Sequence, residues 1–91
     1  ASENATIVSQ AINALREGDV RGGIRRMEAL MIDYGLSGSE VLYEVRTILQ
    51  KEYNHPALAI ALADAEYRLM HANNEYIQLG AFATGIRDVF S

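Results

Sequence analysis

Apolar side chains recur at intervals of three and four residues through this 91-residue sequence, and that spacing most limits what the chain can fold into. A period of 3.6 residues places such side chains on one face of an α-helix, whereas a half-buried strand needs strict alternation. The pattern divides into five amphipathic segments separated by turn residues, and no stretch of the sequence alternates as a strand does. The sequence therefore predicts an all-α fold, a compact bundle of five short helices.

Turn and capping residues mark where the first two segments begin and end. The first helix is predicted from about Glu3 to Glu17, and Gly18 ends it because glycine accepts the left-handed conformation common at helix C-termini. Asp19 is placed to cap the second helix. Gly35 ends that helix, and we expect Leu36 to fold back as the apolar residue of a Schellman turn.

The third segment has the clearest start signal. Ser37 and Glu40 stand three residues apart directly before an apolar pair, which is the form of a capping box. This helix is predicted to end at residues 53–55, because the residue before Pro56 avoids the helical conformation. Pro56 is well placed to open the fourth helix.

Two adjacent glycines, Gly22 and Gly23, lie inside the second segment. Each costs about 1 kcal/mol relative to alanine in a helix interior. Two explanations are open: another helix approaches closely at this point, or the helix is locally broken.

The last two segments each carry a second apolar stripe. The fourth segment has a main stripe made of Leu58, Leu62, Ala65, Leu69 and Ala72. Its second stripe, on the opposite side of the helix, is made of Ile60, Ala63, Tyr67 and Met70. In the fifth, a main stripe of Leu79, Phe82, Ala83, Ile86, Val89 and Phe90 faces away from a thinner one of Ile77, Ala81 and Thr84. A helix that is apolar on two sides either lies centrally in its domain or buries its second face in a partner.

Five short helices cannot all be central, so at least one second stripe is predicted to contact another protein. We expect the first three helices to cover one of the two stripes, and the thinner stripe of the fifth helix to be the more exposed. Tyrosine is enriched at interfaces but also covers core edges with its hydroxyl in water. The predicted subunit-interface residues are Tyr67, Met70, Tyr76, Ile77, Ala81 and Thr84.

Residue patterns that carry chemistry are missing from the sequence. The single lysine, Lys51, is not in a glycine-rich phosphate loop. His55 and His71 are sixteen residues apart and the sequence has no cysteine, so no spacing typical of metal ligands occurs. No catalytic, cofactor-binding or metal-binding residue is predicted, and we expect no enzymatic activity from these 91 residues.

Charge and hydropathy argue against nucleic acid and membrane as partners. The net charge of −4 disfavours non-specific nucleic-acid binding, which relies on lysine and arginine, although Arg21, Arg25 and Arg26 cluster in the second segment. No apolar run approaches the roughly 20 residues of a membrane span, so no membrane partner is expected. The first residue is Ala1 rather than Met, and we expect a piece of a longer protein.

Two stretches of the sequence resemble the C-terminal domain of replication factor C small subunits, the archaeal and eukaryotic sliding-clamp loaders. The first, residues 34–42, is similar to the family's Tyr-Gly-Leu-Ser-Gly-acid-acid-Val-Leu turn, with Ser39 in place of one acid. The second, residues 66–79, is similar to the family's acid-x-Arg-Leu, Gly-Ala-Asn-Glu and x-Ile-Gln-Leu pattern, with Ala72 and Asn73 in place of Gly-Ala. The Leu-x-x-Gly-Asp sequence ending at Asp19 also fits, so the resemblance covers nearly the whole chain.

The resemblance implies that residues 1–91 are a single helical collar domain, excised from a longer archaeal-type AAA+ subunit. In that family the collar domains join other clamp-loader subunits, as homo- or hetero-oligomers, into a ring that supports ATP-driven loading of PCNA onto primer–template DNA. ATP, magnesium, PCNA and DNA would then be bound by the missing N-terminal modules and not by this part. The implied location is the archaeal cytoplasm, or the nucleus in a eukaryote.

Two other classes of function remain open from the residues alone. One is a free-standing helical adaptor or dimerisation module that binds a partner protein, and the other is a small helical enzyme or ligand carrier. A glycine-rich ATP loop encoded upstream of Ala1 distinguishes the collar domain from the adaptor.

Overall fold

The computed structural model describes residues 3–90, and its helices follow the turn signals of the sequence closely. Five α-helices are formed: α1 (Glu3–Arg16), α2 (Val20–Ile32), α3 (Gly38–Glu52), α4 (Pro56–His71) and α5 (Glu75–Gly85). A single turn of 3₁₀-helix, η1 (Arg87–Phe90), follows. None of the described residues lies in a strand, so the predicted all-α bundle of five short helices is confirmed.

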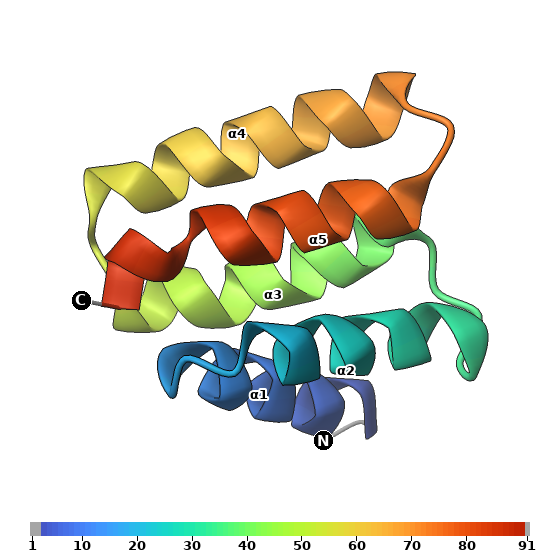
Figure 1. The fold of residues 1–91 in the computed structure, drawn as a ribbon, viewed down its shortest axis with the longest axis horizontal. Helices are drawn as coiled ribbons and strands as arrows, with labels where there is room; N and C mark the ends of the chain where they lie inside the picture. The colour runs from blue at the N-terminus through green and yellow to red at the C-terminus, as the bar shows by residue number, and fades with distance from the viewer. Residues whose placement is uncertain (1–2, 91) are drawn as a thin grey trace.

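Successive helices run in opposite directions, as the short connections between them require (Figure 1). The α1–α2 pair lies at one edge of the molecule and α4 at the opposite edge (Figure 1). Between these edges, α3 packs on α1 and α4, while α5 packs on α2 and α4. Helix α4 packs on α3, α5 and η1, and its outer face is left open.

A continuous apolar core joins all of the elements. Its largest fully buried side chains come from α1, α2, α3, α5 and the residue directly after α5: Val8, Ile12, Met27, Leu30, Val41, Val45, Leu49, Leu79 and Ile86. No polar or charged side chain of the described residues is fully buried. The hydrophobic effect, rather than buried polar bonding between side chains, therefore holds the helices together.

The predicted helix caps of α2 and α3 are present. The Ser37 hydroxyl accepts a hydrogen bond of 3.1 Å from the Glu40 backbone N–H, and the Glu40 carboxylate accepts one of 2.9 Å from the Ser37 N–H. This is the complete capping box. The Asp19 carboxylate accepts a 2.9 Å bond from the Gly22 N–H at the start of α2. The sequence signals for these two helix starts are thus confirmed.

The two glycines in α2 allow close approach, and the alternative of a locally broken helix is wrong. Helix α2 is continuous through both residues. A Cβ atom on Gly23 would lie 2.6 Å from a methyl carbon of Leu15 in α1, and one on Gly22 would collide with the Asp19 cap. The α1–α2 contact therefore needs glycine at position 23.

Three helix ends differ in detail from the sequence-based expectations. The Schellman hydrogen bond expected at Gly35 is shifted, because the Leu36 N–H bonds to the Leu30 carbonyl, six residues back rather than five. Helix α5 ends at Gly85, so the C-terminal part of the fifth predicted stripe, including Phe90, lies in η1 instead. The His55 Nδ1 atom accepts a 3.0 Å bond from the Ala57 N–H, a cap that the sequence analysis did not predict.

One carboxylate links the starts of α3 and α5. Glu75, the first residue of α5, accepts a hydrogen bond from the backbone N–H of Gly38, the first residue of α3. A Cβ atom on Gly38 would lie 2.9 Å from atoms of both Glu75 and Leu69, so only glycine fits there without a shift. Asn74 caps α5 itself by accepting a 3.1 Å bond from the Ile77 N–H.

Candidate subunit interface

The second apolar stripe of α4 is fully open to solvent. Ile60 is 65% exposed, Tyr67 66% and Met70 77%. Ala63 between them is exposed as well. Side chains on the other side of the same helix are buried in the core, including Leu58, Leu62, Ala65 and Leu69. Helix α4 therefore presents an apolar face that the domain itself does not use.

The thinner stripe of α5 is also exposed. Ile77 is 62% exposed, and Ala81 and Thr84 are exposed as well. The Thr84 hydroxyl donates a 2.9 Å hydrogen bond to the Gly80 carbonyl, so its polar group is satisfied within the helix. The stripe consequently offers a nearly apolar surface of small side chains beside Ile77.

Two expectations about these stripes are wrong. The first three helices cover neither stripe, because α3 and α5 flank α4 on its sides and leave its outer face free. The stripe of α5 is not the more exposed of the two, since Met70 on α4 exceeds Ile77 in exposed fraction. The spacing of apolar residues correctly predicted the apolar faces of each helix, but it could not predict where the neighbouring helices pack.

The six predicted interface residues are all exposed, but they do not form one compact patch. Ala81 lines a hollow of about 390 Å³ between α4 and α5, together with Ile60, Asp64 and Arg68. Tyr76 faces a different hollow, between the end of α2 and the α4–α5 turn. Their role in subunit contact stays a prediction.

Met70 borders a groove between α3 and α4, with a volume of about 250 Å³. Its walls also carry Leu42, Tyr43 and Arg46 from α3, and Glu66 from α4. Tyr43 is 58% exposed, and the Arg46 guanidinium carbon lies 4.8 Å from the centre of its ring. The groove thus combines exposed apolar rims with one cation, and sequence periodicity alone did not indicate it.

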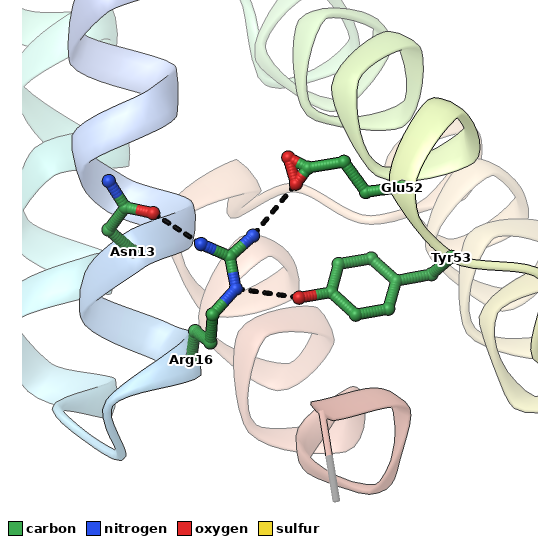
Figure 2. Close-up of polar contacts among 4 residues, drawn as sticks. All are labelled: Asn13, Arg16, Glu52 and Tyr53. Carbon is green, nitrogen blue, oxygen red and sulfur yellow. Dashed lines mark hydrogen bonds and ion pairs between the residues drawn. The ribbon is translucent and has the colours of Figure 1, made fainter.

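A polar cluster at the opposite end of the bundle ties α1 to the end of α3 (Figure 2). Arg16 donates a 2.6 Å hydrogen bond from Nε to the Tyr53 hydroxyl and a 2.8 Å bond from Nη2 to the Glu52 carboxylate. It also donates to Asn13 in its own helix. The hydrogen bond to Tyr53 raises the pKa of Arg16 above its ordinary value. The Tyr53 ring packs edge-on against Phe90 of η1, with ring centres 5.2 Å apart.

This cluster has the features of a structural contact. Arg16 forms an ion pair with Glu52, and each side chain is about two-fifths exposed.

Residues 3–90 contain no group of three or more histidine, cysteine or acidic side chains placed to hold a metal ion. No helix within this range is long and apolar enough to cross a bilayer.

Comparison with known proteins identifies the family. Residues 4–84 match the family described as the replication factor C C-terminal domain. The chain belongs to this family. It is also 36% identical over 89 residues to a replication factor C small subunit of Thermoplasma volcanium. No solved structure gives a significant match.

The match defines which part of the family's proteins this chain represents. It covers 93% of this chain but 27% of the Thermoplasma volcanium protein. The matched region is the helical C-terminal domain of replication factor C and not its ATPase module. The expected absence of a catalytic module from residues 1–91 agrees with that assignment.

The fold explains the two stretches that first suggested replication factor C. Gly38 in the first stretch contacts Glu75 in the second, although 37 residues separate them in the chain. The Ser-Gly pair begins α3, and Asn74 with Glu75 begins α5, so the two stretches form adjoining helix starts. Their residue types are therefore needed for a tertiary contact and not only for local turns.

Proposed function

We propose that this chain is the oligomerisation domain of a clamp-loader small subunit, and that it assembles subunits into the ring that supports ATP-driven loading of PCNA onto DNA in replication. The family match and the similarity to a replication factor C small subunit support this assignment. The structural observation that carries it is the pair of open apolar faces, one on α4 and one on α5, where Ile60, Tyr67 and Ile77 are each more than 60% exposed. A soluble domain exposes such a face at a cost unless a partner covers it.

In this proposal the contacts with ATP, magnesium, PCNA and primer–template DNA belong to other modules of a longer subunit. The partners of the present domain are the corresponding domains of neighbouring loader subunits, identical or different in sequence. The subunit acts in the cytoplasm of an archaeal cell, or in the nucleus if the source is a eukaryote.

The assembly role is tested with Ile77→Asp and Ala81→Arg in the full-length subunit. Each places an unpaired charge on the exposed face of α5, where the isolated fold tolerates it because both side chains are exposed. Burial of that charge between subunits costs several kcal/mol, so light scattering of the reconstituted loader should show loss of the ring. Gln10→Arg, on the exposed side of α1, is the control and should assemble normally.

Circular dichroism of the same proteins separates folding from assembly. Folded variants that no longer form the ring support the proposal. If both variants unfold, the stripe contributes to the core. If both assemble as the unchanged protein does, the contact lies elsewhere on the domain.

The same open face also fits a free-standing adaptor that binds a partner helix. The gene separates the two functions: a glycine-rich ATP loop encoded upstream of residue 1 supports the clamp-loader subunit, and a reading frame that begins at this domain supports the adaptor.

A further inference from the structure

Among residues 3–90, Arg46 is the one side chain with a buried polar atom that has no hydrogen-bond partner. Its Nε atom is shielded from solvent and has no hydrogen-bond acceptor among the described residues. Glu66 lines the opposite wall of the same α3–α4 groove, yet the two do not form an ion pair. A buried donor without an acceptor costs free energy, so the partly exposed Arg46 side chain gains by turning its guanidinium toward an acceptor that enters the groove. The groove therefore favours a ligand that brings an acceptor, ideally an anion, to its α3 wall.

The rims of the groove show what should accompany that acceptor. Met70 and Tyr43 are 77% and 58% exposed, and Leu42 forms the floor as a buried side chain. The matching ligand has an acidic residue flanked by large apolar or aromatic side chains. Its acid must approach Arg46 on α3 and stay away from Glu66 on α4.

The end of α2 presents such a segment. Ile32 is 67% exposed and Tyr34 43%, and the Asp33 between them is exposed as well. Asp33 forms no ion pair within residues 3–90. The Glu3 carboxylate beside the Tyr34 hydroxyl raises the pKa of Tyr34, so the ring of Tyr34, and not its hydroxyl, is what this residue offers to a second copy. The core does not need these three side chains.

The arrangement of the two surfaces suits a ring. A closed ring of three or more like subunits is built from head-to-tail contacts, in which each copy offers two different surfaces. The α1–α2 pair lies at one edge of the molecule and α4 at the other (Figure 1). The Ile32–Tyr34 segment and the α3–α4 groove share no residue, so one copy is able to offer both surfaces, as a head-to-tail contact requires.

We infer that the α3–α4 groove binds the Ile32–Tyr34 segment of a second copy of this chain, with Asp33 of one copy paired to Arg46 of the next. The inference rests on the proposed assembly function and names the two halves of one contact. Opposite charge and exposed apolar side chains on both halves support it.

Charge reversal in the full-length chain tests the pairing. Arg46→Glu and Asp33→Arg are each expected to raise the concentration needed for half-maximal self-assembly by about tenfold or more, since close interfacial charge pairs carry couplings of that size. The double variant, with both charges exchanged, should recover assembly to within about threefold of the unchanged chain. Lys51→Glu on α3 and Glu17→Arg after α1 make the same charge changes on other exposed positions and should have little effect.

Size-exclusion chromatography with light scattering gives the assembly state, and circular dichroism verifies that each variant is folded. Single variants that assemble normally, or a double variant no better than either single one, overturn the inference and leave the proposed function intact. The inferred contact is also overturned if the chain without substitutions stays monomeric. The proposed function fails only if that chain also does not assemble when the other loader subunits are added.

Discussion

The α1–α2 pair and the α4–α5 pair use their apolar residues in different ways. In the first pair, Gly23 brings the two helices into close contact, and the only large apolar side chain left mostly exposed is Ile32, at the end of α2. In the second pair, Ile60, Tyr67 and Met70 remain exposed although the core of the domain is complete. The first pair thus buries nearly all of its large apolar side chains within the domain, whereas the second leaves several of them uncovered.

The largest expected effect on stability comes from comparing two methionines, one in the α1–α2 pair and one in the α4–α5 pair. Met27 in α2 has no exposed surface, and Met70 in α4 is 77% exposed. Met27→Ala should lower the free energy of unfolding by about 2–5 kcal/mol, because it removes buried surface and leaves a cavity. Met70→Ala should change it by no more than about 0.5 kcal/mol. Urea denaturation of both variants measures the difference, and equal losses would show that α4 is covered within the domain.

Two glycines, one in each helix pair, extend the comparison. Their replacement by alanine should change the stability by smaller amounts and in opposite directions. Gly23→Ala should destabilise the domain by about 1–3 kcal/mol, because the new methyl group overlaps Leu15 of α1. A Cβ atom on Gly80 of α5 would be 3.8 Å from the Ile24 side chain, which is ordinary contact. Gly80→Ala should therefore stabilise the domain by about 0.5–1 kcal/mol through the loss of glycine's extra unfolded-state freedom. Denaturation midpoints that shift in the same direction would contradict this account of the α1–α2 contact.

The last prediction concerns the N-cap of α3, the helix that lies between the two pairs in the sequence. Ser37→Ala removes the hydroxyl that bonds to Glu40 and should cost about 0.5–2 kcal/mol. The denaturation midpoint should fall while the slope stays the same, because the surface exposed on unfolding does not change. Ser39→Ala, an exposed position in the first turn of the same helix, is the control. An unchanged midpoint for Ser37→Ala would mean that Glu40 alone is sufficient to start α3.

Local signals were enough to predict most of the helix ends. Gly18, Asp19 and Ser37 act through bonds to residues within five positions, so the sequence contains all that their geometry needs. The end of the fifth helix was harder. Its apolar period continues to Phe90, but Gly85 ends α5 and the edge-on contact of Phe90 with Tyr53 favours a separate turn.

Features that depend on distant residues were not predictable in this way. Arg16 meets Glu52 across 36 residues, and Glu52 alone resembles any solvated acid at the end of a helix. The same is true of the candidate interface: periodicity placed Tyr67 and Ile77 on second apolar faces, while their exposure depends on where α3 and α5 pack. The unpartnered Nε of Arg46 is visible only once the α3–α4 groove has been formed.

The bond between Glu75 and Gly38 has a consequence for the order in which the domain is made. Gly38 is buried, and the acceptor for its backbone N–H is provided 37 residues later in the chain. While the chain is being synthesised, the first three helices emerge before that carboxylate exists, and water must serve as the acceptor. The Gly38 N–H gains its protein acceptor only when α5 arrives, so the two halves gain their final stability together. We therefore expect the domain to become resistant to proteolysis in a single late step, after Glu75 has been added.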